Sequence, residues 1–255
     1  MSAHRLRVQR KPFDTLTAAE NAGWARLLRE SATSRWAFLS PTYAEAATIT
    51  LGPVDVLLFW QSDELVGVMP LQRASGWLGR MGMREPVGRH MTDYFGLLAR
   101  PGLQLDWRSL LLKAGVPCLY FTHLDESQSA HGLKGDSPKS GLRTCIHPAG
   151  GEAHWEWLRT RDKKLVSDTE RRERKLVTEH GPLLFEMQST SPVLDLESLV
   201  SLKNAQYRRT GHEGGALLDP ANACLLSRLM ASQDTNCQPR LSVLRCGEQV
   251  VAGHF

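Results

Sequence analysis

The sequence lacks any apolar stretch approaching the ~18 uninterrupted residues that a membrane helix needs, so it predicts no transmembrane segment. The segment Met1–Phe13 is basic but has no apolar core, and it therefore does not fit a secretory signal peptide. A cytoplasmic protein is the expectation that follows.

The sequence also has few cysteines and only a small net charge. The five cysteines are widely spaced and form no C-x-x-C pair, so no zinc site is predicted and no metal is expected. We interpret them as reduced, partly buried thiols. The net charge of +4 permits a small anionic partner, but it is far from the charge typical of a dedicated nucleic-acid binder.

What the sequence does contain is an alternation of strand and helix patterns over 255 residues, a length that suits two ordinary domains. Apolar runs at 54–60 and 65–72 flank a polar turn and predict a hairpin. One long helix is expected over His154–His180, ending at Gly181-Pro182, and a short strand near Leu142–Ile146. The order predicts an α/β (α+β) fold of mixed sheets flanked by helices.

An internal repeat is the most informative feature. Leu39-Ser40-Pro41, a cap residue followed by a first-turn proline, recurs as Leu218-Asp219-Pro220. The hairpin around Glu64 recurs around Gln249, and each hairpin follows a strand and two helices. We therefore predict two similar lobes, with 1–150 as the first lobe and its linker and 151–255 as the second.

Several short motifs carry a resemblance that spans nearly the whole chain, although each motif alone is weakly specific. They are Phe38-Leu39-Ser40-Pro41, the strand Leu65–Leu71, Thr92-Asp93-Tyr94, Arg171–Leu176, Leu202–Gly211 and Val250–Phe255. In this order they resemble the tandem GNAT acyltransferases of cellulose and exopolysaccharide biosynthesis (CelD/BcsL-like), themselves similar to FemABX peptidyltransferases.

The resemblance implies an acetyl-CoA donor held by a loop of pattern Arg/Gln-x-x-Gly-x-Gly/Ala and the following helix N-terminus. In the second lobe this loop would begin after Phe255, so that lobe is expected to be cut before its cofactor loop, as in a fragment or a natural truncation. In the first lobe Arg73–Leu78 is a near miss, because Leu78 stands where a small residue is needed. The cofactor-binding residues stay unknown.

Direct attack on a thioester needs a general base and an acid for the leaving thiolate. His254, on the last strand, is the candidate base, and Tyr207, near a helix end, is the candidate acid. For each, packing in the sheet or against the helix core is the alternative. Asp93, Tyr94 and Arg208 are candidate substrate-binding residues; capping of a loop or exposure to solvent are the alternatives.

Three functions follow from these observations. The first is acyl transfer, most simply of an acetyl group, from a coenzyme A thioester to a sugar, glycan or amine in polysaccharide or cell-envelope metabolism. The second uses aminoacyl-tRNA as donor, with the basic helix 154–180 contacting RNA, although neighbouring acidic residues pair much of its charge. The third is a non-catalytic scaffold of a polysaccharide synthase complex.

Overall fold

The computed structural model describes residues 6–31, 36–135 and 151–255. Its contacts divide the chain into two compact units. The first unit combines Met1–Asp136 with Lys203–Pro239, and the second combines Ser137–Leu202 with Arg240–Phe255. The strand expected near 142–146 and Cys145 lie outside the described residues.

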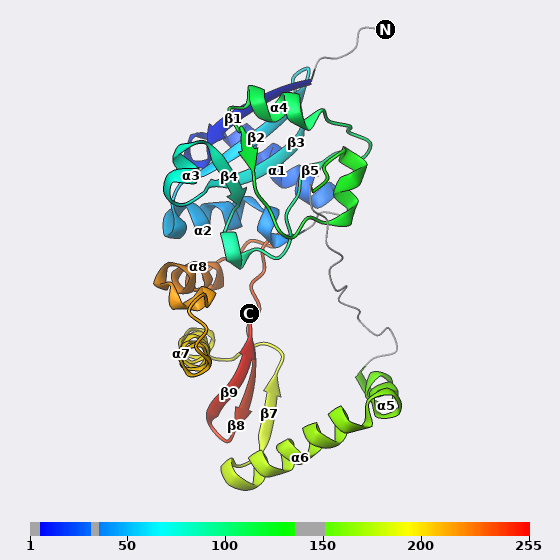
Figure 1. The fold of residues 1–255 in the computed structure, drawn as a ribbon, viewed down its shortest axis with the longest axis vertical. Helices are drawn as coiled ribbons and strands as arrows, with labels where there is room; N and C mark the ends of the chain where they lie inside the picture. The colour runs from blue at the N-terminus through cyan, green and yellow to red at the C-terminus, as the bar shows by residue number, and fades with distance from the viewer. Residues whose placement is uncertain (1–5, 32–35, 136–150) are drawn as a thin grey trace. The chain divides into compact units, whose positions relative to one another are not determined.

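The first unit is built on a curled mixed sheet (Figure 1). The strand order is β1-β2-β3-β4-β6, and β5 pairs with β3 beside β4. All pairs are antiparallel except β4 with β6, which the helix α4 connects as a crossover. The strands are β1 (Leu6–Pro12), β2 (Val54–Gln61), β3 (Glu64–Arg73), β4 (Met83–Pro86), β5 (Leu98–Ala99) and β6 (Cys118–Leu119).

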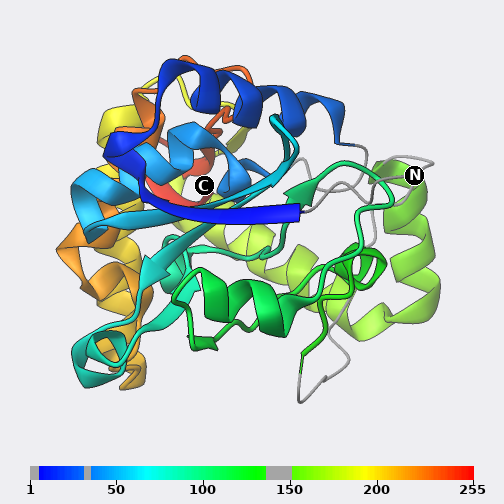
Figure 2. The same ribbon diagram turned by 90° about the horizontal axis from the view of Figure 1, so that it is seen from above.

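Helices cover both faces of this sheet, with α1 and α2 on one side and α4 on the other (Figure 2). Thr17 starts α1 with a capping box, because its hydroxyl accepts from the Glu20 N–H while the Glu20 carboxylate accepts from the Thr17 N–H. Ser40 caps α2 ahead of Pro41, as the sequence predicted. The helices are α1 (Ala18–Glu30), α2 (Pro41–Leu51), α3 (Gly76–Arg80) and α4 (Trp107–Lys113).

Side chains of β2 point alternately to the two faces of the sheet and so contribute to two apolar layers. Leu57 and Phe59 face α4, where Phe59 meets the ring of Trp107 edge to face. On the other side of the sheet lies Trp24 of α1, fully buried, with its indole N–H donating to the Leu39 carbonyl at 2.8 Å. These two layers form the core of the first unit.

Two further helices follow in sequence, α7 (Pro192–Thr210) and α8 (Pro220–Met230). Asp219 caps α8 ahead of Pro220, as expected from the repeat. The apolar side of α8, with Leu225 fully buried, packs on α2. The two proline-capped helices of the repeat therefore contact each other.

The second unit contains a three-stranded antiparallel sheet in the order β7-β8-β9 and the helices that precede it. Buried Val243 and Leu241 mark its small core, while several apolar side chains of β7 and its surroundings are exposed. Its elements are α5 (Gly151–Arg161), α6 (Lys163–His180), β7 (Leu183–Glu186), the first part of α7, β8 (Ser242–Cys246) and β9 (Gln249–His254).

The two hairpins share a backbone irregularity. In β2–β3, Phe59 pairs with Gly67 and Trp60 with Leu65, which leaves one residue of β3 unmatched. In β8–β9, Leu244 pairs with Ala252 and Arg245 with Val250, again leaving one residue unmatched. The bulge falls at the same place in both hairpins when they are aligned by the repeat.

The α/β class of mixed sheets flanked by helices is confirmed. The single helix expected over 154–180 is wrong in detail. Asp162 interrupts it and caps α6 by accepting from the Leu165 N–H at 2.9 Å, so α5 and α6 are separate helices.

The compact units do not follow the predicted division at residue 150. Lys203–Pro239 groups with the first unit because α8 packs on α2. A compact unit is defined by contacts, whereas a repeat is defined by similar segments of sequence. The two lobes 1–150 and 151–255 therefore stay a prediction about the repeat.

Candidate functional site

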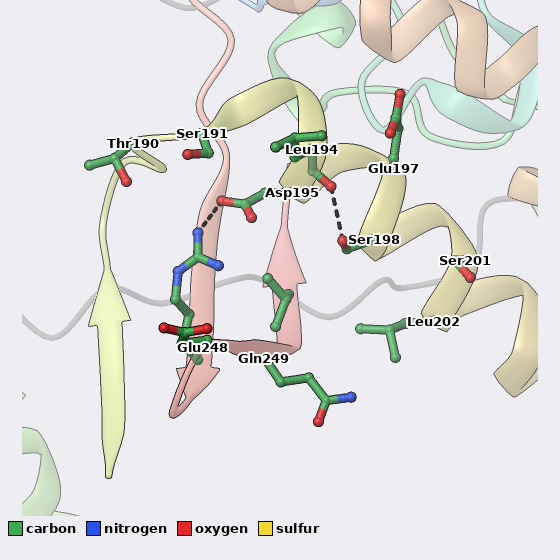
Figure 3. A pocket seen from close by; sticks show the side chains of 12 residues that line it. Thr190, Ser191, Leu194, Asp195, Glu197, Ser198, Ser201, Leu202, Glu248 and Gln249 are labelled. Carbon is green, nitrogen blue, oxygen red and sulfur yellow. Dashed lines mark hydrogen bonds and ion pairs between the residues drawn. The ribbon is translucent and has the colours of Figure 1, made fainter. Parts of the chain in front are cut away.

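A surface groove of about 760 Å³ lies in the second unit between the first part of α7 and the turn of the β8–β9 hairpin (Figure 3). The residues that line it come from two stretches, 190–202 and 245–250, which are far apart in sequence. The lining residues are Thr190, Ser191, Leu194, Asp195, Glu197, Ser198, Ser201, Leu202, Arg245, Glu248, Gln249 and Val250.

Helical spacing places the α7 side chains along one wall of this groove. Leu194, Ser198, Ser201 and Leu202 stand three to four residues apart, so they share one helix face. The Ser198 hydroxyl donates to the Leu194 carbonyl at 2.9 Å, which leaves its oxygen lone pairs available to a ligand. The wall thus alternates apolar side chains with hydroxyl groups.

An ion cluster fixes the opposite wall to the helix. The Arg245 guanidinium donates to Glu186 at 2.6 Å and to the buried carboxylate of Asp195, which also accepts from the Ser189 hydroxyl. These bonds join β8, β7 and the start of α7. Removing Arg245 or one of its carboxylate partners would leave a charge without its counter-ion. These ion pairs therefore stabilise the position of α7 relative to the sheet.

The same cluster sets the ionisation of its members. The hydrogen bond from Arg245, followed by that from the Thr190 backbone N–H, lowers the pKa of Glu186 below its ordinary value. The hydrogen bonds to Glu186 and Asp195 raise the pKa of Arg245. Both groups are therefore charged across the physiological range.

The charge of the lining limits what the groove can hold. It contains the carboxylates of Asp195, Glu197 and Glu248 against a single guanidinium, that of Arg245, which is already paired. A phosphate would find no uncommitted cation among these side chains. Hydroxyl groups, which both donate and accept, and carboxylates, which accept, instead suit a neutral polyol or an amine.

The residues predicted from sequence lie apart from this groove. His254 ends β9 in the second unit, where it is exposed and does not line the groove. The other four candidates belong to the first unit. They are Asp93, Tyr94, Tyr207 and Arg208.

Tyr207 and Arg208 differ in their surroundings. The ring of Tyr207 lies against the backbone of Gly215, where an added Cβ would come within 2.2 Å of the ring, and Lys203 stands over it at 5.1 Å. Arg208 is exposed. This packing accounts for Tyr207 without requiring a catalytic role, and its role as an acid stays a prediction.

Tyr94 belongs to an aromatic cluster. Its ring stacks on that of Trp36 with centroids 3.9 Å apart and planes within 7°, and Phe38 lies alongside at 6.5 Å. Asp93, next to it, is exposed. The binding role of both residues stays a prediction.

The two helix starts that follow the first hairpin do not fit a coenzyme A diphosphate. At α3 the Arg73 side chain donates to the Gly79 carbonyl at 2.9 Å, and Gly79 packs directly on the Ala74 carbonyl, so this near-miss segment is closed on itself. At α4 the N-cap carboxylate of Asp106 already accepts from the Ser109 N–H and would repel an anion. No step through the donor is assigned to these residues.

Sequence reasoning did not find the groove in the second unit. Ser198 and Ser201 stand at helical spacing beside Glu197, which is the one signal that the sequence offers. The contribution of Glu248 depends on how the β8–β9 turn meets α7, which is a tertiary property.

The repeated order of strand, helix, capped helix and bulged hairpin defines a mixed α/β fold compatible with an acyltransferase. Residues 163–255 match the family model described as acetyltransferase (GNAT) domain. The match contains every residue that lines the groove. No curated protein and no solved structure matches the sequence.

Two features are absent from the residues that the structure describes. Among them, no helix has the length and apolar character needed to cross a membrane. The same residues contain no group of three or more His, Cys, Asp or Glu side chains placed to hold a metal ion.

Proposed function

We propose that the protein transfers an acyl group, most simply acetyl, from a coenzyme A thioester to a sugar or amine acceptor. The observation that carries this proposal is the match of residues 163–255 to the GNAT acetyltransferase domain. The polysaccharide or cell-envelope setting is supported by the resemblance of the motifs alone, which is an associational argument.

The groove in the second unit is the proposed acceptor site. Its hydroxyl groups on α7 and its carboxylates on the hairpin can bond vicinal hydroxyls or an ammonium group, and Leu194 and Leu202 offer apolar contact. The ion cluster at Arg245 holds the two walls at a fixed separation, so the acceptor meets an organised surface.

The candidate groups from sequence remain separate proposals. His254 of the second unit, which does not line the groove, is the proposed base, and Tyr207 of the first unit is the proposed acid. Asp93, Tyr94 and Arg208 are proposed substrate-binding residues of the first unit. Replacement of His254 by Ala and of Tyr207 by Phe should then lower kcat, whereas packing roles would leave kcat intact in folded protein.

The direct test is thiol release from acetyl-CoA by the full chain with a panel of amino sugars, neutral sugars and amines. Ser198→Ala should raise the KM for the accepted compound by roughly fivefold, about the value of one hydrogen bond. Ser227→Ala is the matched control, because Ser227 also donates to the carbonyl four residues earlier but lies on α8 outside the groove. Equal kinetics for the two variants would remove the groove from the proposal.

A second candidate changes the donor to aminoacyl-tRNA. It is favoured by the exposure of Arg171, Arg172, Arg174 and Lys175 on α6, although Arg171 and Lys175 pair with neighbouring acidic side chains. Salt-sensitive tRNA binding that is lost in Arg172→Ala/Arg174→Ala would support it. A chain that shows neither thiol release nor tRNA binding would favour the scaffold of a polysaccharide synthase complex.

A further inference from the structure

A second groove, of about 1120 Å³, lies in the first unit between α1 and the turn of the β2–β3 hairpin. Gly23 and Arg26 of α1 form one wall, and Trp60, Asp63 and Glu64 of the hairpin form the other. Neither the family match nor the proposed acyl transfer gives this groove a role, since the match covers residues 163–255.

The two grooves occupy the same place in the repeated unit. The bulged pairing aligns Trp60 with Arg245, because each pairs with the residue that precedes the unmatched one on its partner strand. The hairpin residues that line the groove of the first unit therefore occupy positions equivalent to those that line the groove of the second unit. A hollow beside the turn is therefore a property of the repeated backbone, and its side chains decide what it holds.

Trp60 forms an aromatic surface in the first unit's groove. The β2 alternation that turns Phe59 towards α4 turns Trp60 towards α1, and the Arg7 guanidinium stands over its ring at 5.7 Å. Its indole N–H is buried and has no hydrogen-bond partner among the described residues. Trp60 is half-buried and lines the groove, so the indole ring, and not its shielded N–H, is the surface offered to a ligand.

The charges of the groove lining balance, with Arg26 and Arg100 against Asp63 and Glu64. The Glu64 carboxylate accepts from Arg100 at 2.5 Å and lies 3.8 Å from Arg26, and all three side chains are about half exposed. The Arg7 guanidinium over the Trp60 ring adds one positive charge beside the groove but does not line it. Both guanidinium groups of the lining thus face the Glu64 carboxylate, which a phosphate or a free carboxylate would have to displace.

Gly23 explains why the helix can approach the hairpin here. An added Cβ at Gly23 would lie 3.0 Å from the Leu65 side chain, so glycine lets α1 pack closely on β3 below the groove. The floor is consequently apolar and continuous with the indole, while the planar polar groups stand around it. A sugar ring can stack its apolar face on such an aromatic surface. Its hydroxyl groups can at the same time bond the planar donors and acceptors around it.

We propose that the groove formed by Gly23, Arg26, Trp60, Asp63, Glu64 and Arg100 binds a neutral saccharide. The ring stacks on Trp60, and its hydroxyls bond the Asp63 carboxylate, the remaining lone pairs of Glu64 and the spare N–H groups of the two arginines. This binding does not require the acyl transfer proposed above. The site would hold a glycan on the first unit whether or not the second unit acylates it.

The test measures binding by the full chain without any acyl donor, using titration calorimetry and saturation-transfer NMR. The probes are a β-linked glucose oligosaccharide, an N-acetylglucosamine oligomer, a galacturonate oligomer and inorganic phosphate. Saturable binding of a neutral oligosaccharide is the expected result. Trp60→Ala should weaken that binding by about tenfold or more, the scale of an aromatic anchor.

Trp77→Ala is the matched control, because Trp77 is 65% exposed and lies outside the groove. Glu64→Gln guards against a folding defect in Trp60→Ala, since Glu64 is half exposed and its loss should also weaken binding. Failure of every neutral probe to bind, stronger binding of phosphate or galacturonate, or unchanged binding in Glu64→Gln and Trp60→Ala would overturn the proposal.

Discussion

The two grooves of this molecule share a backbone and differ in one decisive side chain. In the second unit the position after the hairpin bulge is Arg245, which is bound to Asp195 and Glu186 and ties the sheet to α7. In the first unit the same position is Trp60, whose N–H has no partner among the described residues. The comparison shows that a repeated framework supplies the hollow, while the side chain after the bulge makes it ionic or aromatic.

The largest expected effect concerns α8, which the repeat assigns to the second half and the contacts assign to the first unit. Leu225 is fully buried where α8 packs on α2. Leu225→Ala should lower the free energy of unfolding by about 2–5 kcal/mol, through lost burial and the cavity left behind. Chemical denaturation measures the loss, and hydrogen exchange locates it.

Amides of α2 should lose protection in Leu225→Ala before those of β8 do. Cys224→Ala is a suitable control, since Cys224 is exposed on the same helix. If β8 were the first element to open, α8 would belong energetically with the second unit.

A smaller loss is expected from Arg245→Ala, since Arg245 is partly exposed. The substitution leaves the buried Asp195 without its cation, so the melting temperature should fall. Trp60→Ala, at the equivalent position, removes a side chain that makes no hydrogen bond through its N–H and should lower the melting temperature less. The opposite ranking in calorimetric melts would mean that Arg245 does not organise its groove.

The smallest effect is a pH dependence that should separate the two units. Arg245 lowers the pKa of Glu186 in the second unit, whereas burial, partly offset by Arg89, raises the pKa of Glu85 in the first. A lowered folded pKa contributes stability above the unfolded value of about 4.3, and that stability is lost as the pH falls through the folded value. The raised pKa of Glu85 works in the opposite direction, because its folded form binds the proton more tightly.

Melting curves of wild type and Glu186→Gln should therefore converge as the pH falls below about 4.3. The difference in melting temperature between wild type and Glu85→Gln should change with pH in the opposite direction. Parallel curves at every pH would show that the Arg245 cluster does not tune Glu186.

Much of the fold was predictable because its signals are local. The caps Ser40-Pro41 and Asp219-Pro220 and both hairpins follow from short patterns, and the structure contains them all. The break at Asp162 is also local, but the helical pattern that continues on both sides of it hides it in the sequence. Local chemistry therefore fixes where the elements begin and turn.

The rest depends on contacts that periodicity does not encode. The packing of α8 on α2 joins segments more than a hundred residues apart, so the grouping of 203–239 with the first unit had no sequence signal. The groove at Ser198 likewise needs the hairpin turn at Glu248 to meet α7. The candidates His254 and Tyr207 came from family resemblance, and they stay predictions.

The most direct measurement of the central claim is acyl transfer to a small acceptor by matched variants of the two grooves. Thiol release should show a raised acceptor KM in Ser198→Ala and an unchanged one in Trp60→Ala, because a small acceptor would engage only the groove of the second unit. A raised KM in Trp60→Ala with normal kinetics in Ser198→Ala would contradict the account.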